Sequence, residues 1–187
     1  MTKTNVFSAR KMALAGLCAA FLAVISQIHV PLPLGVPITI QVFAVAFIGV
    51  LLGPGAGVLS VIVYILLGAC GLPIFAGFQG GLGVIAGPAG GYIIAWPVMT
   101  VLSGLNPGQK GDGKQGFYLQ CLLALAGLAV VECFGGLWWA ISAAGNFGAI
   151  MLYSLTAFIP KDCVLTVLAV IAGRRMKHLV ARAGLDL

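Results

Sequence analysis

The sequence predicts an all-α, polytopic membrane protein, with one integral-membrane domain over residues 1–187 and six transmembrane helices. Three observations predict this class. Hydrophobic residues make up 61% of the chain and charged residues 7%, whereas an ordinary soluble domain has about 25% charged residues. Long apolar segments recur between Lys11 and Arg174, and the mean hydropathy is +1.13. Lysine and arginine gather at the chain ends and in one connecting segment, which is typical of topology signals rather than of a nucleic-acid-binding face.

The six predicted spans cover residues 11–29, 38–52, 55–70, 89–105, 117–139 and 157–174. The second and third are short for a bilayer, which requires about 20 residues. Residues 141–156 are expected to form a loop and a partial helix that dips toward the membrane. Pro160 is expected in the first turn of the last helix, where its missing N–H costs nothing. Because the first apolar run lacks a small-residue cleavage site and more spans follow it, we do not expect a removable signal peptide.

The distribution of positive charge predicts the orientation of these spans. With six spans, nine basic residues fall on one side of the membrane, and only Lys161 falls on the other. The nine are Lys3, Arg10, Lys11, Lys110, Lys114, Arg174, Arg175, Lys177 and Arg182. The positive-inside rule then places both termini in the cytoplasm. Residues 30–37, 71–88 and 140–160 are consequently expected on the outer side.

The segment 75–92 has an unusual composition, with seven glycines in eighteen residues and no formal charge. Glycine allows the backbone to approach a neighbour or a ligand closely. Irregular backbone at membrane depth survives only where protein buries it or where it lines a cavity. The segment is therefore predicted to form the wall of a ligand cavity on the outer side.

Polar residues at the outer ends of spans are candidates for ligand contact. Thr39 and Gln41 follow a segment with three prolines, which is either a rigid connector or a lid. Asp162 is either a first-turn acid favoured by the helix N-terminus or an acceptor for ligand N–H groups. Lys161 either pairs with Asp162, meets a ligand carboxylate, or extends its ammonium group toward the interface.

Three further features each have two readings. Glu132, deep in the fifth span, is either a buried structural acid or an ion-coupling site. The small residues Ala15 and Ala19 in the first span serve either internal packing or docking of a partner membrane protein. The tryptophans are expected in the core or at the membrane interface. The five cysteines lack ligand spacing, so we expect no metal site.

Several sequence blocks carry a resemblance to a known family. They are Pro31–Gln41, Leu52-Gly-Pro54, Gly68–Gly77, Gly80-Gly-Leu-Gly83, Gly87-Pro-Ala-Gly-Gly-Tyr92 and, as a weaker match, Pro160-Lys-Asp162. In their order and spacing, over nearly the full length, the chain resembles the biotin-specific S-components (BioY type) of energy-coupling factor transporters.

This resemblance implies a six-helix protein of the bacterial cytoplasmic (inner) membrane that captures biotin in an outward-facing pocket. It implies partnership with a transmembrane T-component and two cytoplasmic ATPases, with biotin as the transported ligand and no cofactor. Asp162 would receive the ureido N–H groups of biotin, and Ala15 and Ala19 would dock on the T-component. The substrate-binding residues would be Thr39, Gln41, Phe75, Gln79, Gly80, Gly81, Tyr92, Lys161 and Asp162, with Phe75 and Tyr92 flanking the bicycle.

The chain departs from the family pattern at three positions. Leu165 stands where the family has a lysine, and leucine cannot bind a carboxylate. Lys161 replaces the glycine before the aspartate, so its ammonium group is a candidate for that contact. Ala89 replaces a threonine.

The first functional hypothesis is biotin uptake by such an S-component. The alternative is a self-sufficient secondary transporter coupled to protons through Glu132. An enzyme is not expected, because the sequence has no nucleophile–base constellation and no Walker A motif.

Overall fold

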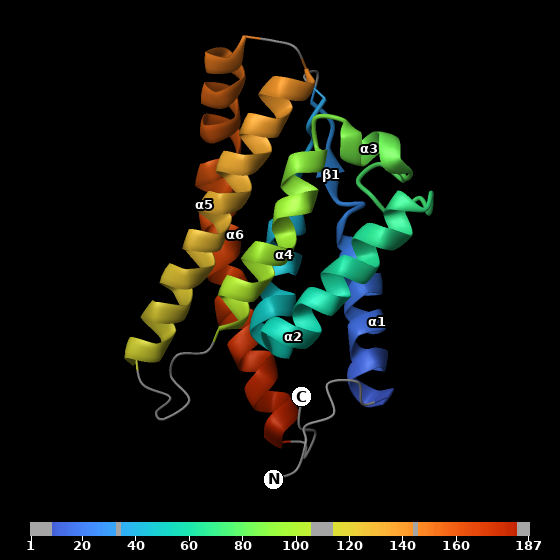
Figure 1. Ribbon diagram of the computed structural model, residues 1–187. Coiled ribbons are helices and arrows are strands. Elements are labelled where there is room, and N and C mark those ends of the chain that lie inside the picture. Colours follow the sequence, from blue (N-terminus) through green and yellow to red (C-terminus); the bar gives the residue numbers. More distant parts are fainter. Residues whose placement is uncertain (1–8, 33–34, 106–113, 144–145, 183–187) are drawn as a thin grey trace.

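The computed structural model of the protein describes residues 9–32, 35–105, 114–143 and 146–182 (Figure 1). In this part of the chain it has six helices: α1 (Ala9–Ile25), α2 (Gln41–Ala69), α3 (Leu82–Ala86), α4 (Gly90–Gly104), α5 (Lys114–Ser142) and α6 (Phe147–Arg182). Strands β1 (His29–Val30) and β2 (Ile38–Thr39) form one short antiparallel ladder, in which His29 lies opposite Thr39. The predicted all-helical class is confirmed.

Three of the described helices are long and apolar enough to cross a membrane. They are α2, α5 and the part of α6 from Phe147 to Val180. The apolar parts of α1 and α4, Lys11–Ile25 and Gly90–Gly104, are shorter. The six helices do not correspond one to one to the six predicted spans, because two spans belong to α2 and α3 is a single short turn on the rim.

Helix α2 joins the second and third predicted spans through a sharp bend. The backbone of Gly53 is not helical, with φ 77° and ψ 177°, and Pro54 follows it. Glycine reaches this positive φ without a side-chain clash. The two arms of α2 therefore form a V whose bend lies in the lower half of the molecule in Figure 1. The apparent shortness of both spans is explained by this shared bend.

The prediction for the last span is wrong at its start. Helix α6 begins at Phe147 and continues through Pro160, so residues 147–156 are helical rather than a loop with a partial helix. Asn146 caps the start, since its side-chain oxygen accepts the N–H of Ala149 at 3.1 Å. Pro160 lies inside the helix, and its missing N–H leaves the Thr156 carbonyl without its usual helical donor. Neighbouring helices and hydroxyl side chains allow proline inside such helices.

Helix α4 lies at the centre of the bundle, between α2 and α5, and α6 packs on both α2 and α5. Close contact between α4 and α5 depends on a glycine, because a Cβ at Gly135 would meet the ring of Tyr92. Helix α1 packs on α2 at the opposite side of the bundle from α5 (Figure 1).

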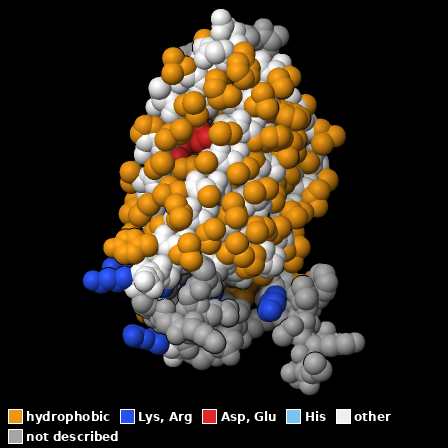
Figure 2. Space-filling model, turned by 60° about the vertical axis from the view of Figure 1, so that its left-hand side comes forward, with side chains coloured by type: hydrophobic (Ala, Val, Ile, Leu, Met, Phe, Trp, Pro, Cys, Tyr) orange, Lys and Arg blue, Asp and Glu red, His pale blue; other side chains and the backbone are white. Residues whose placement is uncertain are grey.

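The charged side chains are distributed unevenly along the bundle. The beginning of α1 and the end of α6 lie at the same end of the molecule (Figure 1). Figure 2 shows lysine and arginine side chains only at that lower end, and a small acidic patch surrounded by hydrophobic side chains in the upper half. Lys3 and Lys110, two of the predicted topology signals, lie outside the described residues.

Candidate ligand-binding pocket

A cavity lies in the upper half of the bundle, where the segment after β1, the glycine-rich segment, α4, α5 and α6 converge. The cavity volume is about 80 Å³, which is below the roughly 300–1,000 Å³ of typical small-molecule sites. The lining is mostly apolar and aromatic, with a few polar groups. The lining includes Thr39, Gln41, Phe75, Gln79, Tyr92, Trp96, Glu132, Phe158, Lys161 and Asp162.

The glycine-rich segment folds back on itself to form one wall of this cavity. The Phe75 N–H donates to the Gln79 carbonyl at 2.9 Å, which closes a tight turn that contains Gly77 at φ 72°. The Phe75 ring is 1% exposed and lies directly on Gly68, where any side chain would collide with it. Gln27 at the end of α1 holds the turn, because its amide oxygen accepts the Phe78 N–H at 3.0 Å. The prediction that this segment lines a cavity is confirmed.

The two glycines predicted to bind substrate lie beside the cavity rather than in its lining. A Cβ at Gly80 would meet the backbone carbonyl of Leu72, so this position keeps two loop segments in contact. Gly80 lines a shallower depression that shares Gln79 with the cavity. Gly81 has φ 96° and immediately precedes α3. In this structure Gly80 and Gly81 determine the shape of the cavity wall.

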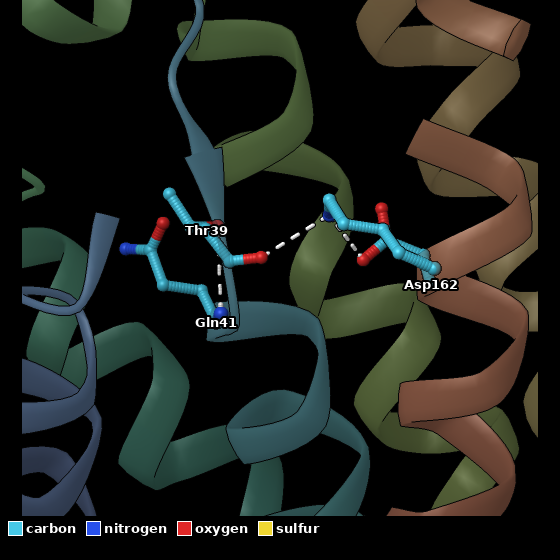
Figure 3. Close-up of polar contacts among 4 residues, drawn as sticks. Thr39, Gln41 and Asp162 are labelled. Atoms are coloured by element: carbon cyan, nitrogen blue, oxygen red, sulfur yellow. Dashed lines mark hydrogen bonds and ion pairs between the residues drawn. The ribbon is translucent and has the colours of Figure 1, made fainter. Parts of the chain in front are cut away.

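Thr39 and Gln41 contribute in different ways. The Thr39 carbonyl faces the cavity and accepts a hydrogen bond from Lys161 Nζ at 3.1 Å (Figure 3). The Gln41 side-chain amide donates to Ser26 Oγ at 2.8 Å and to the Tyr64 hydroxyl at 3.3 Å. Tyr64 in turn donates to the Ile74 carbonyl at 3.0 Å. Gln41 therefore connects the cavity to a buried network that supports the glycine-rich wall.

Lys161 and Asp162 form an ion pair on the α6 side of the cavity. Lys161 Nζ lies 2.6 Å from Asp162 Oδ1, and the two side chains are 26% and 3% exposed. Figure 3 shows Thr39 and Asp162 on opposite sides of the bridging ammonium group. The same ammonium group lies 5.4 Å from the centre of the Phe158 ring, within range of a cation–π attraction. Two of the readings of Lys161 need no ligand: pairing with Asp162, and extension of the ammonium group toward the interface. The structure shows the pairing.

Aromatic rings fill the remaining sides. Tyr92 packs edge-on against Phe158 with ring centres 5.9 Å apart, and its hydroxyl lies 2.6 Å from Ser154 Oγ. Phe75 packs edge-on against Tyr64 at 5.5 Å. The predicted pair Phe75 and Tyr92 therefore lines one cavity, as does Gln79. Such a lining can hold a flat apolar ring system while the ion pair orients a polar head group.

The family model for the "BioY family" matches residues 1–182. The chain belongs to the BioY family. It is 40% identical over 169 residues to a protein of Pyrococcus horikoshii named "Probable biotin transporter BioY", covering 90% of this chain and 97% of that protein. It is 33% identical to the "Biotin transporter BioY" of Rhizobium etli, over 89% of this chain and 92% of that protein.

A solved structure supports the BioY fold. The crystal structure described as "the S-component for biotin from an ECF-type ABC transporter" matches with a TM-score of 0.83 and 28% identity, and the match covers 95% of each chain. The arrangement of helices described above is therefore that of an S-component.

Glu132 and Trp96 are among the cavity-lining residues of this BioY chain that were not predicted as substrate contacts. Glu132 on α5 is 1% exposed and lines the cavity together with Asp162. Trp96 on α4 was expected in the core or at the interface; it is buried but also lines the cavity. The available signal for Glu132 was an ionisable residue inside an apolar span, which marks a functional candidate.

The predicted docking residues of α1 are not on the surface. Ala15 and Ala19 are 2% and 4% exposed, and α1 packs on α2. The structure thus favours internal packing for this pair. Gly16 and Ala20, the overlapping pair on the same helix, are exposed. Small residues for close approach of a partner helix are therefore present on α1, one position further along the chain.

Proposed function

We propose that the chain is the biotin-binding and uptake component of an energy-coupling factor transporter. It is a transport component and not an enzyme, as its family membership and the names of its relatives indicate. The observation that carries the proposal is the cavity itself, which combines aromatic walls with one partly buried ion pair. Biotin requires both, because it has an apolar bicycle, a ureido head with donors and an acceptor, and an anionic tail.

In this proposal the bicycle lies between the Phe75 and Tyr92 rings. The ureido N–H groups donate to Asp162, and Gln79 assists from the glycine-rich wall. The biotin carboxylate meets Lys161, which is the lysine that the cavity offers in place of the family lysine at the position of Leu165. Supporting this placement, Lys161 has its ammonium group at the cavity surface between Thr39 and Asp162.

We infer that both termini face the cytoplasm, with α1, the two arms of α2, α4, α5 and α6 as six spans of a cytoplasmic membrane, taken to be a bacterial inner membrane. The cavity and Lys161 then lie toward the outside. In support, the beginnings of α1 and α5 and the last part of α6, which carry Lys11, Lys114, Arg174 and Arg175, lie in the lower part of the molecule in Figure 1.

The proposed partners are a transmembrane T-component and two cytoplasmic ATPases. The described chain contains no nucleotide-binding motif of its own, so energy for uphill uptake would come from them. The exposed face of α1 around Gly16 and Ala20 is the proposed docking surface, because small residues permit close helix packing in a membrane.

Ligand identification tests the proposal. The protein is purified in detergent and titrated by calorimetry with biotin, biotin amide, thiamine and riboflavin. Saturable binding of biotin, with no binding of the other two vitamins, is the expected result. Binding of another vitamin in preference to biotin would refute it.

A proton-coupled secondary transporter is the second candidate, and one observation favours it. Glu132 and Asp162, two acidic residues from different helices, line the same cavity and interact electrostatically. Uptake into proteoliposomes that contain this chain alone distinguishes the two functions. Uptake driven by an imposed proton gradient, abolished by Glu132→Gln while binding persists, would support the carrier. No gradient-driven uptake would support the S-component.

A further inference from the structure

Glu132 is the buried acid of the cavity that has no ion-pair partner among the described residues. It extends from α5, is 1% exposed, and lines the same space as Asp162. Its Oε2 atom is buried and accepts no hydrogen bond from the described part of the chain. A buried carboxyl oxygen without a donor is unfavourable, because water no longer solvates it.

The charged and titratable groups around Glu132 leave this oxygen without a donor. The Asp162 carboxyl group on α6 lies within hydrogen-bonding reach of Glu132, so the two acids can share one proton, which serves one oxygen of each. Lys161 faces Glu132 from α6, and Tyr92 interacts with it from α4. The Lys161 ammonium is directed to Asp162 at 2.6 Å and to the Thr39 carbonyl at 3.1 Å. The Tyr92 hydroxyl is engaged with Ser154 at 2.6 Å. The donors nearest to Glu132 are thus already used within the protein.

Two buried hydroxyls offer a comparison. Ser103 Oγ and Thr166 Oγ1 also lack a partner in the described residues, but neither lines the cavity. A neutral hydroxyl is less costly to bury than a carboxyl group. Glu132 therefore differs from these two hydroxyls in two ways. Its carboxyl group is more costly to bury without a partner, and a ligand in the cavity can reach it.

We propose that Glu132 is a second ligand acceptor, which receives one ureido N–H while Asp162 receives the other. This inference rests on the proposed biotin function and adds a specificity-determining residue to it. A cyclic urea has two N–H donors on opposite sides of one carbonyl, and α5 and α6 present one carboxyl group each. A carboxylate at either position would also attract a head group that carries positive charge.

The test compares biotin with 2-iminobiotin, in which a cationic guanidinium replaces the urea. Kd values are measured by calorimetry in detergent for the wild type, Glu132→Gln and Glu132→Leu. Glutamine keeps a neutral acceptor and should weaken biotin about 3-fold to 10-fold, whereas leucine should weaken it at least about 10-fold. For 2-iminobiotin the loss in Glu132→Gln should be about 10-fold larger than for biotin, because the charge attraction is lost as well.

Thr166→Val is the matched control, because it alters a buried polar side chain that has no partner and lies outside the cavity. Its Kd values should equal those of the wild type. Equal losses for the two ligands in Glu132→Gln would mean a purely structural role for the acid and would overturn the inference. Unchanged affinity in both Glu132 variants would do the same.

A second arm uses only the wild-type protein and is independent of variant folding. Biotin methylated at N1′ and biotin methylated at N3′ each lack one ureido donor. If both N–H groups meet a carboxyl group, both analogues should bind at least about 10-fold more weakly than biotin. If either methylated analogue binds like biotin, a single acceptor suffices and the inference is wrong. Absence of biotin binding to the wild type would reject the proposed function together with it.

Discussion

Replacing Asp162 by asparagine is the most informative single change, because it separates binding from stability. The side chain is 3% exposed and its Oδ1 atom lies 2.6 Å from Lys161 Nζ. Asparagine has nearly the same shape but carries no charge. In the proposed complex it replaces a charge-assisted hydrogen bond to the ureido group by a neutral one.

The magnitude follows from these contacts. A hydrogen bond to a charged group contributes about 1.5–3 kcal/mol, so the Kd for biotin should rise about 10-fold to 150-fold. Breaking a fully buried ion pair costs about 3–5 kcal/mol of unfolding free energy. Because the Lys161 side chain is 26% exposed and can reach solvent, the stability loss here should be smaller than that.

The assay is calorimetric titration of biotin into the purified protein, together with thermal unfolding. A double variant, Asp162→Asn with Lys161→Met, removes the unpaired ammonium. It should recover part of the melting temperature but none of the biotin affinity. A Kd for Asp162→Asn equal to that of the wild type would remove Asp162 from the site. Recovered affinity in the double variant would show that the unpaired lysine, and not a lost ligand contact, caused the effect.

Three further predictions test the lysine, the glycine-rich wall and the docking face. Lys161→Ala should weaken biotin more than biotin amide, whereas equal losses would exclude a contact with the carboxylate. Gly80→Ala should lower the unfolding free energy by about 1–3 kcal/mol and weaken biotin binding, because its Cβ would meet the Leu72 carbonyl. The control Gly83→Ala, whose Cβ meets nothing within 4 Å, should change neither. Thermal unfolding measures the stability and titration the affinity. Ala20→Leu on α1 should reduce ATP-driven uptake in reconstituted vesicles without changing biotin affinity. Ala126 is exposed on α5, and the control Ala126→Leu should change neither uptake nor affinity. Equal uptake by the two variants would contradict docking through α1.

The sequence predicts the helical class and the cavity wall because both depend on local composition. A run of apolar residues without charges can only be a buried or membrane helix, and seven glycines without a charge cannot be an ordinary soluble loop. The bend of α2 was also present in the sequence, as the boundary at Gly53 and Pro54 between two spans that are each too short.

The start of α6 could not be predicted with the same rule. Proline favours the first turn of a helix in water, because its missing N–H leaves no donor unpaired there. In α6, Pro160 lies in the interior of a helix that packs on α2 and α5. The helix is favoured over a loop because a bilayer leaves irregular backbone without hydrogen-bond partners.

The pairing of residues across helices was outside the reach of sequence patterns. Glu132 appears in the sequence as an isolated acid, 30 residues before Asp162. Only the packing of α5 on α6 brings both acids to one cavity. The sequence shows that α1 carries small residues at helical spacing, but it does not show which of them face α2. The pair Ala15 and Ala19 is buried and the pair Gly16 and Ala20 is exposed, although the two pairs differ by a single position.

The position of Lys161 resolves an apparent conflict in the charge balance of the site. If its ammonium group were fully used by Asp162, an anionic ligand tail would have to break that pair. An ammonium group has three N–H donors, and the described contacts use two of them, on Asp162 Oδ1 and on the Thr39 carbonyl. A ligand carboxylate can therefore take the third donor while the ion pair stays intact. In the proposed complex the pair would support binding at both ends of the ligand, since the lysine that meets the carboxylate would also hold the aspartate in place for the ureido head.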